Sequence, residues 1–171
     1  MKTKTKRVAL SGVLSAVAIL LMSIGSIITV LDMSVAFLAG FCVIIARIEL
    51  DRASAWGVYL VSGVLAFVLL PNKFVGVAFL CYGGIYPIIK ELCEKIKIKW
   101  LMWAAKLVSS NVLLTLIIWL GKYFTVATDD ALGFEIWIYL LGIVIFIAYD
   151  IALTLVITRY YQLFRRRRSG K

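Results

Sequence analysis

Few polar residues lie inside the apolar stretches of this sequence, and they limit the chemistry open to it. Lys106 and Asp150 each interrupt a long apolar run. Lys106 follows Trp100 by six residues and Asp150 precedes Arg159 by nine, which places them about 9 Å and about 13 Å inside their helices. An ionisable group within a bilayer costs at least about 2.5 kcal/mol. Both residues are therefore functional candidates.

The similar depths of these two residues predict that they pair, or share a polar network, between consecutive helices. Three interpretations stay open. The pair is a structural staple, or Lys106 extends its ammonium group to the membrane interface, or Asp150 belongs to a polar site together with Asn111 and Tyr149. Asn111 is also suited to hydrogen bonding between helices.

A second polar feature is the run of tyrosine, glycine and proline between Tyr82 and Pro87. These residues weaken a helix and expose its backbone, which a membrane tolerates only where the chain packs on protein or lines a cavity. Tyr82 has a depth similar to that of Asn111, so the two are expected to form one pocket wall. The predicted substrate-binding residues are Tyr82, Asn111, Tyr149 and Asp150.

Enzymatic chemistry is disfavoured. The sequence has no histidine, which removes the commonest general base and zinc ligand. Its three cysteines are scattered and form no Cys-x-x-Cys pair. There is no Gly-x-Ser-x-Gly, P-loop or His-Glu-x-x-His motif, and we expect no pair of buried carboxylates. We therefore expect no enzyme, no catalytic residues, no metal site and no cofactor.

The elements that position these residues are apolar spans. Of 171 residues, 63% are hydrophobic and 16% are charged, against roughly 45–50% and about 25% in soluble domains. A span needs about 20 apolar residues, and six such spans leave no room for a soluble domain. Their expected ranges are 8–31, 33–46, 53–72, 74–89, 100–121 and 136–158. The sequence thus predicts an all-α polytopic integral membrane protein, a single six-helix transmembrane domain over 1–171.

The lysine and arginine residues predict the orientation. Numbering the loops alternately places 16 of the 19 basic residues on the side of the N-terminus, while only Lys73 and Lys122 fall on the other side. Such a bias puts both termini in the cytoplasm. The net charge of +10 is then explained by topology and by attraction to membrane lipid, so we expect no nucleic-acid binding. Docking of the Arg165–Arg168 cluster on an acidic cytoplasmic partner is a second interpretation.

Aromatic and acidic residues fit the same topology. The five tryptophans fall near predicted helix ends, as in an aromatic belt; for Trp119 and Trp137, stacking on a ligand is an alternative role. The longest outer loop runs from Lys122 to Glu135 and contains Asp129 and Asp130. It is expected to be a solvated connector, or else the cap of a site open to the exterior.

The first span carries small residues at helical spacing, namely Ala9, Gly12 and Ala16. Gly12-x-x-x-Ala16 is a small-xxx-small pattern, which lets another helix approach closely. The face packs either inside the protein or against a partner. We predict that it docks a partner.

The opening stretch from Lys6 to Gly12, continued to Ala16, resembles the start of substrate-binding S components of energy-coupling factor (ECF) transporters. Length, six spans and cytoplasmic termini are also similar, although Gly12 stands where alanine is usual. The resemblance implies a bacterial cell membrane protein. It also implies a small-residue face that docks on a transmembrane coupling protein, which two cytosolic ATPases drive. The implied substrate is a small molecule such as a vitamin or its precursor, bound from outside by the later helices.

A rival interpretation comes from another class of protein. The rod-shape membrane protein MreD is similar in size and span count, and this resemblance implies a scaffold that transports nothing. No distinctive motif of that family occurs in the sequence. Co-purification from the native membrane separates the two interpretations, because ATPases would favour the importer and cell-wall elongation proteins the scaffold.

Overall fold

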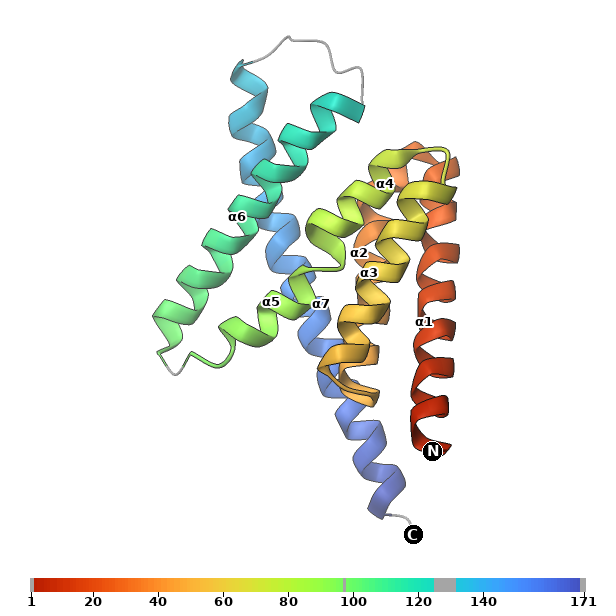
Figure 1. Ribbon diagram of the computed structural model, residues 1–171. Helices are drawn as coiled ribbons and strands as arrows, with labels where there is room; N and C mark the ends of the chain where they lie inside the picture. The colour runs from red at the N-terminus through yellow and green to blue at the C-terminus, as the bar shows by residue number, and fades with distance from the viewer. Residues whose placement is uncertain (1, 97, 125–131, 170–171) are drawn as a thin grey trace. The chain divides into compact units, whose positions relative to one another are not determined.

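The computed structural model describes residues 2–96, 98–124 and 132–169, and every regular element among them is helical (Figure 1). The elements are α1 (Lys2–Ile27), η1 (Thr29–Leu31), α2 (Asp32–Glu49), α3 (Arg52–Leu69), α4 (Lys73–Ala78), the π-helical segment η2 (Phe79–Gly83), α5 (Tyr86–Cys93), α6 (Lys99–Phe124) and α7 (Leu132–Ser169). The predicted all-α class is confirmed.

The chain divides into two units, Met1–Ala131 and Leu132–Lys171. In the first unit, α1, α2 and α3 run alternately up and down, the segment from α4 to α5 returns, and α6 runs back again (Figure 1). The second unit contains α7 alone. The single six-helix domain therefore stays a prediction.

Five helical segments of the described residues are long and apolar enough to cross a membrane: Lys4–Ile27, Arg52–Leu69, Lys73–Cys93, Lys99–Leu120 and Tyr139–Tyr160. Helix α2 is not among them, because its 18 residues include Asp32, Arg47 and Glu49. The chain therefore has the character of a multi-pass membrane protein.

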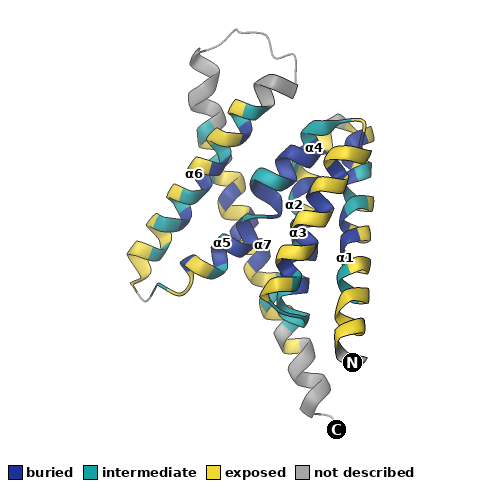
Figure 2. Cartoon of the chain, viewed as in Figure 1, coloured by how far each residue is buried: buried dark blue, intermediate teal, exposed yellow. Residues whose placement is uncertain are grey.

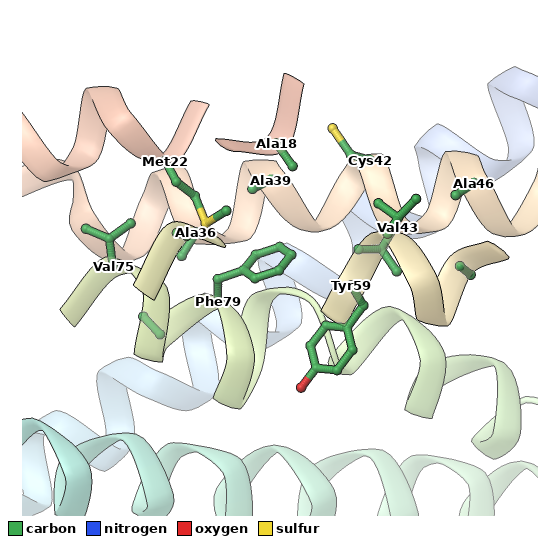
Figure 3. Packing of buried hydrophobic residues seen from close by; sticks show 14 of the residues in the cluster. Ala18, Met22, Ala36, Ala39, Cys42, Val43, Ala46, Tyr59, Val75 and Phe79 are labelled. Atoms are coloured by element: carbon green, nitrogen blue, oxygen red, sulfur yellow. The ribbon is translucent and has the colours of Figure 1, made fainter. Parts of the chain in front are cut away.

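Helix α2 forms the centre of the first unit. Half of its residues are buried, including Val35, Ala39, Cys42 and Val43. The core around it draws Ala18 and Met22 from α1, Tyr59 and Ala66 from α3, and Val75 and Phe79 from the α4–η2 segment (Figure 3). Small side chains on α2 allow this close packing. The outward faces of α1 and α3 remain exposed (Figure 2), as expected of helices that face lipid.

Several helix ends differ from the expected spans for local reasons. Helix α3 ends at Leu69, three residues earlier than expected, because Leu70 precedes a proline and adopts an extended conformation (φ −78°, ψ 140°). Asn72 then caps the N-terminus of α4, and its side chain accepts a hydrogen bond from the Phe74 N–H (3.0 Å). Helix α1 ends at Ile27, and the short η1 turn occupies the rest of the first expected span.

Candidate functional site

The expected weak point of the fourth span is present as a break between two helices. The N–H of Gly84 donates to the carbonyl of Phe79, five residues back (2.8 Å), which is the π-helical pattern of η2. The hydroxyl of Tyr59 on α3 donates to the carbonyl of Leu80 (2.7 Å). Helix α5 then starts with a proline in its first turn, where the missing N–H costs no hydrogen bond. Thus α3 supplies a hydrogen bond to the backbone of the break.

The break packs closely against its neighbours. A Cβ atom at Gly83 would overlap the carbonyl oxygen of Ala36 on α2, and one at Gly84 would lie 2.6 Å from the ring of Tyr59. A Cβ atom at Gly76 on α4 would lie 2.9 Å from the backbone nitrogen of Phe67 on α3. At these positions the backbone of the fourth span approaches α2 and α3 more closely than any larger residue allows. A membrane tolerates such a break where the chain packs on protein or lines a cavity, and here the break packs on protein.

Tyr82 lies within this packed region and is 3% exposed. Its hydroxyl oxygen lies 2.6 Å from the hydroxyl oxygen of Ser110 on α6, and either group can donate. Its ring packs on Phe37 of α2, with centroids 5.1 Å apart, and stacks on Tyr86 at 5.9 Å. Tyr82 therefore connects α2, the fourth span and α6.

Asn111 follows Ser110 on α6, but its side chain has a local partner. Its amide nitrogen donates to the carbonyl of Leu107 in the same helix (2.9 Å). The contact between Tyr82 and α6 is thus made through Ser110, a residue that sequence reasoning did not select. Its position next to Asn111, at a similar depth in the span, is the sequence signal that could have identified Ser110.

Tyr149 and Asp150 occupy consecutive positions on α7. The carbonyl of Asp150 accepts a hydrogen bond from the Thr154 hydroxyl (2.8 Å). Because α7 forms the second unit, a common site with Tyr82 stays a prediction, and so does the pair with Lys106. Residues 125–131 of the outer loop, with Asp129 and Asp130, lie outside the described residues.

Lys106 contacts an acidic residue that the sequence analysis overlooked. Its Nζ atom lies 3.0 Å from Oε1 of Glu94, one residue beyond the end of α5, and 5.7 Å from the centre of the Trp103 ring. Lys90 reaches the same Glu94 oxygen at 3.3 Å. Both lysines are at least 97% buried. Glu94 thus bridges α5 and α6 across the turn between them.

Further ion pairs join helix ends at the same end of the first unit. Glu91 on α5 accepts two hydrogen bonds from the Arg47 guanidinium of α2, at 2.6 Å and 2.7 Å. Asp51, before α3, lies 3.0 Å from Arg7 of α1. Hydrogen bonds from Ser54, and then the Arg7 charge, lower the pKa of the Asp51 carboxyl. We call this the basic end, defined by Arg7, Arg47, Arg52, Lys90, Lys95 and Lys106. Three of the basic segments expected on one side of the membrane therefore meet.

The small-residue face of α1 points away from the core. Ala9, Gly12 and Ala16 are all exposed, and a Cβ atom at Gly12 would meet nothing within 4 Å. The opposite face of the helix contributes Ser15, Ala18 and Met22 to the interior. This face therefore does not pack inside the part of the chain that the structure describes, and docking on a partner stays a prediction.

Comparison with known proteins adds no relative. No protein-family model, curated protein or solved structure matches the chain.

Proposed function

We propose that this chain is the substrate-capture membrane subunit of an ATP-driven importer of the ECF type. The observation that carries the proposal is the exposed face of α1, on which Ala9, Gly12 and Ala16 leave room for a close helix partner. The opening sequence from Lys6 to Ala16 resembles S components at the same place. The partners in this proposal are a transmembrane coupling protein and cytosolic ATPases.

The proposed topology has six spans with both termini in the cytoplasm of a bacterial cell. Helix α2 is the sixth span, because its 18 residues extend about 27 Å against a hydrocarbon thickness of about 30 Å. Its charged residues, Asp32, Arg47 and Glu49, lie at its two ends. Support for the orientation comes from the basic end, where ion pairs join the start of α1, the α2–α3 junction and the α5–α6 turn.

The proposed substrate is a small molecule that enters from outside. The residues proposed to bind it are Tyr82, Asn111, Tyr149 and Asp150, of which Asp150 can supply a charge and Tyr149 a hydroxyl group. The alternative is a scaffold of the MreD type. It is favoured by the contacts of Tyr82, whose hydroxyl and ring both have partners within the protein.

A matched pair of glycine variants tests the proposal. Gly12 on α1 and Gly57 on α3 are both exposed helical glycines with nothing within 4 Å of an added Cβ atom. The full chain is tagged, purified from its native membrane, and the associated proteins are identified by mass spectrometry. We expect ATPase subunits with the wild type and with Gly57→Leu, and their loss with Gly12→Leu.

The alternative outcomes are distinct. Cell-wall elongation proteins in place of ATPases would establish the scaffold. Unchanged ATPase recovery with Gly12→Leu would refute docking through α1. A small molecule released from the purified wild type, and absent from an Asp150→Asn variant that still recovers the ATPases, would identify both the substrate and its site.

A further inference from the structure

Three polar side chains from separate segments meet at the end of the first unit opposite the basic end. Ser26 lies near the end of α1, Asp32 begins α2, and Asn72 precedes α4 (Figure 1). The backbone N–H of Asn72 donates to Oγ of Ser26 (3.0 Å), and its side-chain nitrogen donates to Oδ2 of Asp32 (2.8 Å). Asn72 therefore holds a hydroxyl group and a carboxyl group close to each other.

The two oxygens of Asp32 have unequal surroundings. The side chain is 8% exposed. Oδ2 has the Asn72 amide, whereas Oδ1 is buried and has no hydrogen-bond partner in the part of the chain that the structure describes. The neighbouring cation, Lys73, directs its ammonium group to the carbonyl of Val68 instead (3.0 Å). A buried carboxylate oxygen without a partner is costly, so this oxygen indicates a ligand.

Burial disfavours the ionised form of Asp32, but two neighbouring features stabilise it, and a bound cation would stabilise it further. The N-terminus of an α-helix stabilises negative charge, and Asp32 is the first residue of α2. The Asn72 amide donates a hydrogen bond to the carboxylate, which also favours the charged state. The ligand expected at Oδ1 is therefore a cation rather than a hydrogen-bond donor alone.

The donor set restricts the kind of cation. Asp32 and Ser26 offer oxygen atoms only, and α1 ends one residue after Ser26, where a helix presents unpaired main-chain carbonyls. Oxygen ligands suit alkali and alkaline-earth ions. One carboxylate supplies a single negative charge, and no group of three or more His, Cys, Asp or Glu side chains suited to a metal occurs among the described residues. A single charge favours a monovalent ion.

We propose that Asp32 Oδ1 and Ser26 Oγ bind a monovalent alkali cation at this end of the first unit. Asn72 joins the α1–α2 connection to the α3–α4 connection by its hydrogen bonds to Ser26 and Asp32. The bound cation would strengthen this contact by its attraction to the Asp32 carboxylate. This site is independent of the small-residue face of α1 and of the residues proposed to bind substrate. Refutation of this site would therefore not refute the proposed importer function, and the reverse also holds.

The experiment measures the thermal unfolding of the purified full-length protein in detergent, in NaCl against choline chloride at equal ionic strength. At 100 times the dissociation constant, binding should raise the melting temperature by about 5–10 °C, with a saturable dependence on Na⁺. Asp32→Asn should abolish the difference. Asp51→Asn, which changes the acid at the start of α3 at the basic end, should retain it.

Other outcomes overturn the proposal. Equal melting of the wild type in Na⁺, K⁺, Li⁺ and choline would refute it, as would a full Na⁺ effect in Asp32→Asn. Melting that follows pH but not Na⁺ would show that Asp32 holds a proton. Should Asp32→Asn fail to fold, Ser26→Ala keeps the carboxylate. That variant should need about tenfold more Na⁺, a loss of about 1.4 kcal/mol, and an unchanged requirement would refute the site.

Discussion

Replacing Gly83 with alanine is expected to destabilise the protein, although alanine is the better helix former. The added Cβ atom would overlap the carbonyl oxygen of Ala36 and lie 2.7 Å from its carbonyl carbon. These are backbone atoms of α2, so no side-chain rotation relieves the overlap. The two helices must separate, and overpacking of this kind typically costs about 1–3 kcal/mol.

The control is the same substitution at Gly57, where the new methyl group would meet nothing within 4 Å. There, alanine gains helix propensity, and Gly57→Ala should stabilise the protein by at most about 1 kcal/mol. The same substitution is therefore expected to lower the free energy of unfolding at Gly83 and to raise it at Gly57. Helix propensity alone predicts that alanine stabilises the protein at both positions.

The assay is unfolding of the purified variants in detergent, followed by circular dichroism with increasing denaturant or temperature. Far-ultraviolet spectra of the native states should match, which shows that each variant folds. A Gly83→Ala variant as stable as Gly57→Ala would refute the close approach of α2 and the fourth span. A destabilisation at both positions would mean that the outer face of α3 is covered.

Three more outcomes are expected. Tyr59→Phe should lose about 0.5–1.5 kcal/mol of unfolding free energy in the same assay, because the partly buried Leu80 carbonyl loses its hydrogen bond; an unchanged value would contradict that role. Lys106→Met and Glu94→Gln should be non-additive by at least about 0.5 kcal/mol, because the ammonium and carboxylate groups lie 3.0 Å apart, and strict additivity would show that the two residues do not interact. Membrane-impermeant thiol labelling in cells should reach a cysteine placed at Thr128 and miss one at Ser169, and external labelling of Ser169 would overturn the orientation.

Sequence periodicity and composition were enough to predict the helices and the break in the fourth span. The two adjacent glycines and the proline at position 87 indicate a weak helix without reference to any other segment. The π-helical form of η2 and the hydrogen bond from Tyr59 to Leu80 could not be predicted. They depend on contacts across 21 residues, which local patterns do not contain.

The polar residues were harder to place than the apolar ones. Asn111 was selected because an amide in a span needs a partner, and the structure gives it the carbonyl of Leu107 in its own helix. Ser110 was not selected, yet it is the residue that meets Tyr82. Which of two neighbouring residues faces the adjacent helix depends on helix rotation, which periodicity fixes poorly when most positions are apolar.

The ion pair between Glu94 and Lys106 makes Asp150 a stronger functional candidate than Lys106. Sequence depth is measured at the backbone, but a lysine side chain can carry its charge several ångströms toward the helix end. Lys106 does so, because its ammonium group lies 3.0 Å from a carboxylate just beyond the end of α5. Asp150 has a short side chain that allows no such displacement. Its charge stays at the depth of its backbone, so the functional hypothesis for the later spans depends on Asp150 more than on Lys106.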